Sequence, residues 1–128
     1  GAIATTIAHD SHNLIVVGTN DDDMLLAVAE TARIGGGIVL VKGGRVLKTM
    51  PLPIAGLMTD QDAYQVRQDL QELRTTARGM GITADYDPFM ALSFVSLPVI
   101  PAAKLTDMGL VDVNRSRIVP VAWIESAG

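Results

Sequence analysis

The chain has 128 residues, of which 48% are hydrophobic and 19% charged, and its formal net charge is −4. This length suits one domain with a single core, and the lack of cysteine excludes disulfides, thiolate metal sites and thiol nucleophiles. The basic residues are scattered, which argues against nucleic-acid binding, and the longest uncharged apolar stretch, residues 89–103, contains two prolines and is too short to span a membrane.

A polar cluster separates the first two predicted strands. Residues 2–7 and 14–18 are rich in β-branched residues and predict buried strands. The connection between them holds both histidines of the chain, and strand ends can present such side chains to a ligand. We therefore take five residues as candidates for contact with a substrate: His9, Asp10, Ser11, His12 and Asn13. The alternative is an ordinary turn, because Asp, Ser and Asn side chains bind nearby backbone.

The histidine pair also suggests a metal site. His9 and His12 are three residues apart with Asp10 between them, and imidazole and carboxylate groups ligate divalent ions. A hydrolytic metal centre commonly needs three protein ligands or more, however, and only carboxylates are available to assist the two histidines. We expect no independent metal centre here. The two histidines can still hydrogen-bond to a metal ligand from elsewhere or face a substrate.

A helix is predicted from residue 21 to about residue 34. Thr19 or Asn20 is a suitable N-cap, and the three successive aspartates that follow complement the positive end of the helix dipole. The helical spacing predicts a buried face of four residues: Leu25, Val28, Ala29 and Ala32. Gly35 and Gly36 are expected to end the helix.

A β-hairpin and an uncharged loop come next. Strands are predicted at residues 38–42 and 45–49, joined by the two-residue turn Gly43-Gly44. Pro51 and Pro53 then favour extended chain, so that the segment 51–58 is interpreted as a loop stiffened by proline and turned by glycine.

The clearest helix of the sequence is predicted from Thr59 to Met80. Thr59 and Asp62 resemble a capping box at its start. Apolar residues then recur at helical spacing and form one stripe: Val66, Leu70, Leu73, Ala77 and Met80. Such a stripe usually packs on a sheet of the same domain. Four methionines are expected to fill gaps in the core: Met58, Met80, Met90 and Met108.

The last third of the chain predicts a short helix and two late strands. The helix begins at Asp87-Pro88 and runs to about Phe94, and the strands cover residues 111–113 and 118–124. Lys104 and Asp107 lie between these elements and are weaker candidates for contact with a ligand or a neighbouring domain. The alternative is that they are ordinary charges of an exposed loop.

These elements together predict an α+β fold. We expect one domain over residues 1–128, in which a mixed β-sheet is layered against two principal helices that share one face of the sheet. No internal repeat, low-complexity tract or linker divides the sequence.

Several short motifs occur in a fixed order along the chain. AHDSHN at residues 8–13 is followed by VVG at 16–18, by GGGI at 35–38 and by PLPIAGLM at 51–58. DPFM then begins at residue 87, LSF at 92, LPVIP at 97, KLTD at 104 and GLVDV at 109. In this order, over nearly the whole chain, the motifs resemble the C-terminal domain of bacterial adenine deaminases, which belong to the metal-dependent amidohydrolase superfamily.

The resemblance implies a parent enzyme that hydrolyses adenine to hypoxanthine and ammonia. A cytoplasmic location fits the lack of cysteine. Members of this family begin with an amidohydrolase barrel, and nothing in this sequence corresponds to that barrel. The implied divalent metal, manganese or iron, belongs to the barrel, so that no cofactor is expected in this chain and the isolated chain is expected to be inactive. The implied partners are the barrel of the same polypeptide and adenine. A homo-oligomer is compatible with the mean hydropathy of +0.32.

A second interpretation remains open at this point. The chain can be a stand-alone small-molecule-binding or assembly module that shares this domain and has no catalytic function. Deaminase activity of the complete gene product would separate the two.

Overall fold

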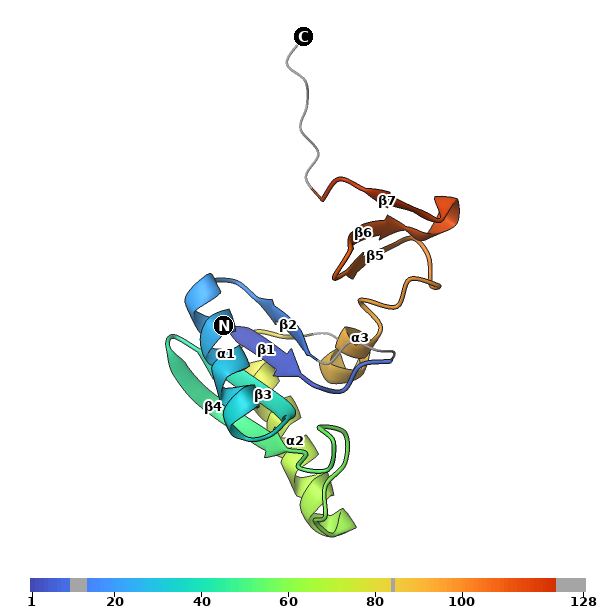
Figure 1. Cartoon of the computed structure of the whole chain (residues 1–128). Helices are drawn as coiled ribbons and strands as arrows, with labels where there is room; N and C mark the ends of the chain where they lie inside the picture. Colours follow the sequence, from blue (N-terminus) through green and yellow to red (C-terminus); the bar gives the residue numbers. More distant parts are fainter. Residues whose placement is uncertain (10–13, 84, 122–128) are drawn as a thin grey trace. The chain divides into compact units, whose positions relative to one another are not determined.

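The fold is built from two compact units, Gly1–Ser93 and Phe94–Gly128. The computed structural model describes residues 1–9, 14–83 and 85–121. The first unit contains β1 (Ala2–Thr5), β2 (Ile15–Gly18), α1 (Asp21–Arg33), β3 (Gly37–Lys42), β4 (Arg45–Pro51), α2 (Ala63–Gly79) and α3 (Pro88–Ser93) (Figure 1). The second unit contains β5 (Ala103–Thr106), β6 (Gly109–Asp112), the 3-10 turn η1 (Val113–Arg115) and β7 (Arg117–Val119).

The first unit is centred on a four-stranded sheet in the order β2-β1-β3-β4. Each pair of neighbouring strands is antiparallel, so the expected mixed sheet is wrong, whereas the α+β class is confirmed. β1 is buried over its whole length, as predicted. β2 is an edge strand in which Val17 keeps 49% of its surface exposed, so the prediction of two buried strands is correct only for β1.

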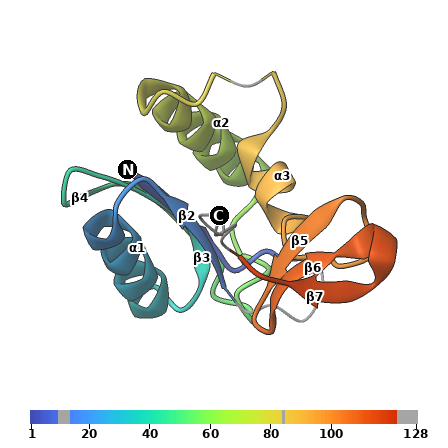
Figure 2. The same cartoon turned by 90° about the horizontal axis from the view of Figure 1, so that it is seen from above.

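Helices cover both faces of this sheet. Side chains alternate along a strand, so Ile3, Ile38 and Leu40 face a core that includes Leu73 and Ala77 of α2. Ala2, Ala4, Val39 and Val41 face a second core against Ala27 of α1. Figure 2 shows α1 and α2 on opposite sides of the strands. The prediction that both helices share one face is therefore wrong, because β1 and β3 are apolar on both faces and each face needs a cover.

The helix α1 turns a different face to the sheet from the one predicted. Its buried residues are Asp23, Ala27 and Thr31, whereas Leu25 is 68% exposed. The other three residues of the predicted face are also exposed: Val28, Ala29 and Ala32. The two buried polar side chains are tolerated because they are hydrogen-bonded, the Thr31 hydroxyl donating to the Ala27 carbonyl at 2.7 Å.

Asp23 fastens α1 to the turn between β3 and β4. Its carboxylate accepts hydrogen bonds from the amides of Gly44 at 2.7 Å and Gly43 at 3.1 Å, and from the side chain of Asn20 at 3.0 Å. These donors, the Gly44 amide above all, hold the pKa of Asp23 well below its usual range. Asn20 is the N-cap, as predicted, and accepts from the Asp23 amide at 2.8 Å.

The low pKa of Asp23 predicts an acid-dependent contribution to stability. An unfolded aspartate titrates near 3.9, so the Asp23 carboxylate should stabilise the fold above about pH 4 and lose that effect as the pH falls further. We expect Asp23→Asn to lower the urea midpoint at pH 7 and to approach wild type below about pH 4. Asp22→Asn, at an exposed position of the same turn, is the matched control. A gap between wild type and Asp23→Asn that stays constant with pH would contradict this role.

The helix α2 presents the predicted stripe to the core but begins later than expected. Leu73 and Ala77 are buried, and three further members of the stripe pack against them half-buried: Val66, Leu70 and Met80. The predicted capping box is wrong. Asp62 is the N-cap and accepts from the Gln65 amide at 2.9 Å, while Thr59 accepts from the amide of Gln61 at 3.3 Å, outside the helix.

The second unit is a three-stranded antiparallel sheet in the order β5-β6-β7. β5 was not expected from the sequence, and it pairs with β6 so that Lys104 lies opposite Val111. β7 begins one residue before the predicted strand, at Arg117, and the part of that prediction beyond residue 121 lies outside the described residues.

Candidate functional site

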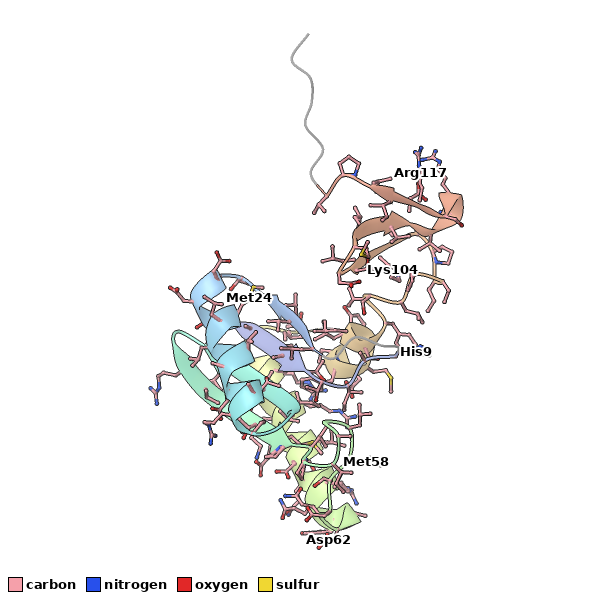
Figure 3. The ribbon with its side chains drawn as sticks, in the orientation of Figure 1. His9, Met24, Met58, Asp62, Lys104 and Arg117 are labelled. Carbon is pink, nitrogen blue, oxygen red and sulfur yellow. The ribbon has the colours of Figure 1, made fainter. Side chains whose placement is uncertain are left out.

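Three of the sequence motifs described above lie at one end of the four-stranded sheet. Thr5 at the end of β1 pairs with Ile15 and with Ile38, and Gly37 pairs with Pro51 at the end of β4. The β1–β2 connection, the turn before β3 and the segment after β4 therefore leave the sheet at the same end. Figure 3 labels His9 and Met58 on two of these three connections.

His9 begins the polar cluster at this end. It follows β1, its side chain is exposed, and its backbone amide donates to the Ser93 carbonyl of α3 at 3.1 Å. The connection is thus tied to α3 where the cluster starts. The other four candidates lie outside the described residues: Asp10, Ser11, His12 and Asn13.

A threonine hydroxyl holds the segment 51–58, which we call the apolar loop, against the end of the sheet. Thr6 Oγ1 donates to the Gly56 carbonyl at 2.5 Å and accepts from the Gly37 amide at 2.8 Å. Gly36 lies so close that a Cβ there would be 2.6 Å from the Gly56 Cα. We call these two hydrogen bonds of the hydroxyl the Thr6 clamp. The sequence did not predict the clamp, because the glycines give no sign of which hydroxyl bonds to their backbone.

An apolar cavity of about 200 Å³ opens at the end of β1, where Thr5 lines it. Its lining comes from strands, α2 and α3 and includes Ile7, Leu70 and Phe89. Arg74 and Asp87, which also line it, form an ion pair at 2.6 Å. Burial favours a raised pKa for Asp87, but hydrogen bonds from Arg74 and from the amides of Met90 and Phe89 outweigh it and lower the pKa.

Asp87 has the capping role predicted for it. Its side chain accepts from the amides of Phe89 at 2.9 Å and Met90 at 3.1 Å. Its second oxygen binds the guanidinium group of Arg74 on α2. The ion pair therefore links α2 to the start of α3 and leaves Asp87 engaged on both oxygens.

The weaker candidates belong to the second unit. Lys104 lies on β5 rather than in irregular chain, and its ammonium group donates to the Ala103 carbonyl at 3.3 Å. Asp107 is exposed in the turn between β5 and β6. Thr106 closes that turn, since its hydroxyl donates to the Gly109 carbonyl at 2.9 Å and accepts from the Met108 amide.

A family model described as the adenine deaminase C-terminal domain matches residues 1–117. This chain belongs to that family. The adenine deaminase resemblance noted in the sequence is thereby confirmed, and with it the assignment of the chain to the C-terminal part of such proteins.

Curated relatives of this adenine deaminase C-terminal domain are much longer than the chain itself. Adenine deaminase 2 of Carboxydothermus hydrogenoformans is 56% identical over 122 residues, which cover 95% of this chain and 21% of the relative. The adenine deaminase of Nitratidesulfovibrio vulgaris strain DP4 is 57% identical over 89% of this chain and 20% of its own length. That of Bacillus subtilis strain 168 is 54% identical over the same shares. The chain thus spans about a fifth of the length of these relatives.

The adenine deaminase C-terminal domain does not assemble a metal site from its described residues. Within residues 1–9, 14–83 and 85–121, no three histidine, cysteine, aspartate or glutamate side chains are grouped to hold an ion. The donor set of this part of the chain therefore does not fit the divalent metal that the family implies. In the same residues, no helix is long and apolar enough to cross a membrane.

Proposed function

We propose that this chain serves an adenine deaminase, which hydrolyses adenine to hypoxanthine and ammonia, by forming part of the rim of a substrate pocket built by the rest of the polypeptide. The observation that carries this proposal is the identity of 56% to an adenine deaminase over 95% of the chain. In this proposal residues 1–128 work as one C-terminal domain in the cytoplasm, and the metal, manganese or iron, is held by the amidohydrolase barrel of the same polypeptide.

The placement of the polar cluster supports a role at the rim. Strands flank it on both sides, and the His9 amide is bound to α3. Anchoring a connection at its ends lowers the conformational entropy that ligand binding costs. In our proposal the Asp10 carboxylate accepts a hydrogen bond from the exocyclic amine of adenine, and an imidazole nitrogen of His12 pairs with a ring nitrogen.

Asp10→Asn and His12→Gln in a full-length adenine deaminase carrying this domain test the rim proposal. A lost hydrogen bond to the substrate should lower kcat/KM roughly 10- to 100-fold, while the melting temperature changes little. Asp22→Asn, the same change at an exposed position of α1, is the control and should leave both quantities unchanged. Activity lost only in step with the melting temperature would make the cluster a structural turn. A full-length wild-type protein without adenine deaminase activity would refute the proposed reaction and favour the binding-module interpretation.

A further inference from the structure

The apolar loop exposes three large hydrophobic side chains. Ile54 is 44% exposed, Leu57 53% and Met58 58%. Met58 was expected to fill the core, and its exposure shows that this prediction is wrong. The same prediction is wrong for Met90 and Met108, which are 62% and 73% exposed. Leu52 and Gly56 alone in this segment are buried and anchor it. The loop therefore buries Leu52 and turns the side chains of Ile54, Leu57 and Met58 toward solvent.

The same loop is ordered by several hydrogen bonds of its own. Ile54 and Met58 form an antiparallel β-bridge. The Ile54 amide donates to the Met58 carbonyl at 3.0 Å, and the Met58 amide donates to the Ile54 carbonyl at 3.1 Å. The Leu52 amide donates to the Gly36 carbonyl at 3.0 Å, and the Thr6 hydroxyl holds Gly56. A surface that is already fixed in shape loses little conformational entropy when a partner binds it.

We propose that the apolar loop is a docking contact by which this domain binds the catalytic portion of its own adenine deaminase polypeptide. The inference rests on the proposed function, because the partner is the barrel assigned there. The relatives match this chain over 20–21% of their length, so about four-fifths of each lies outside it and is available to cover the loop. The loop leaves the same end of the sheet as the polar cluster, so docking there would bring the cluster toward the catalytic portion.

Charge distinguishes the apolar loop from the exposed apolar face of α1. The outer face of α1, which carries Leu25 and Val28, adjoins the exposed carboxylates of Asp21 and Asp22 and the guanidinium of Arg33. The segment 51–58 contains no charged residue. The centres of protein interfaces are depleted of charge and enriched in methionine and aromatic residues, which favours the loop as the contact.

Thiol labelling tests this docking contact. The chain has no cysteine, so Leu57→Cys introduces a single thiol, and Leu25→Cys on the 68% exposed position of α1 is the matched control. Each variant is made in the 128-residue chain and in a full-length adenine deaminase, and labelled with a maleimide whose position is read by peptide mass spectrometry. We expect position 57 to react at least about tenfold more slowly in the full-length protein than in the chain alone. Position 25 should react equally in both.

Equal rates at position 57 in the two proteins would overturn the proposal, and so would protection at position 25 instead. Slow labelling of position 57 in the 128-residue chain alone would also overturn the proposal. If the protection increases with protein concentration, a second copy of the chain covers the loop. If it does not, the second unit of the same chain covers it. Adenine deamination measured on the same full-length preparations separates the two proposals. An active enzyme with an unprotected thiol at position 57 refutes docking only. A protected thiol in the Leu57→Cys variant, together with an inactive wild-type full-length protein, refutes the proposed reaction only.

Discussion

Replacing Gly37 with alanine is expected to lower the free energy of unfolding by about 4 kcal/mol. Gly37 begins β3 with a φ of 140°, a conformation that residues with a side chain rarely adopt, and an added Cβ would lie 2.1 Å from the Met50 carbonyl oxygen. That oxygen belongs to β4, which pairs with β3 at this point. Relief of the clash would therefore separate two strands of the central sheet, and urea denaturation would measure the loss.

Gly35→Ala is the control for this change. Gly35 also has a positive φ, of 77°, but an added Cβ meets no atom within 4 Å. This substitution should cost only about 1–2 kcal/mol, from backbone strain alone. If the two variants lost the same stability, the contact between Gly37 and Met50 would not be the cause.

Leu73→Ala should lower the free energy of unfolding by about 2–5 kcal/mol. Leu73 is fully buried at the centre of the core between α2 and the sheet. Its truncation removes apolar burial and leaves a cavity, because strands on one side and α2 itself on the other limit collapse. Thermal and urea unfolding of the purified variant would give the value.

Two neighbours on α2 show whether burial sets this effect. Gln71 is exposed, so Gln71→Ala should change stability by less than about 0.5 kcal/mol. Leu70 is half-buried at the edge of the same core, and Leu70→Ala should fall between the two. Equal losses at positions 71 and 73 would show that the helix does not present the face described here.

Elements with strong local signals were predictable from the sequence. The stripe on α2 has large apolar residues at helical spacing, and Leu73 and Ala77 are buried as that spacing requires. The turn Gly43-Gly44 predicted a two-residue hairpin, and Lys42 pairs with Arg45 across it.

The face of α1 was not predictable in the same way. Hydrophobic spacing favoured Leu25 and Val28, but the helix buries Asp23 and Thr31. The Thr31 hydroxyl is satisfied within the helix by the Ala27 carbonyl, whereas the Asp23 carboxylate binds the distant Gly43 and Gly44 amides. Such partners are 20 and 21 residues away along the chain. A pattern read over a single helix cannot include them.

The candidate site was predictable in part. The sequence placed the polar cluster at a connection between strands, and His9 does follow β1. The Thr6 clamp on Gly56 joins residues 50 positions apart, and the Arg74–Asp87 pair joins residues 13 apart. Both depend on how strands and helices pack, so neither left a local signal.

The placement of β1 and β3 between two cores has a consequence for how the first unit comes apart. Alternate side chains of these strands belong to different hydrophobic layers, Ile38 and Leu40 to one and Val39 and Val41 to the other. If one hydrophobic layer comes apart, one face of β1 and β3 becomes exposed to solvent. The strands are then destabilised, and with them the packing of the other layer. The two layers therefore act as one cooperative unit. We therefore expect the backbone amides of β1 and β3 to exchange with solvent only through global unfolding of the first unit.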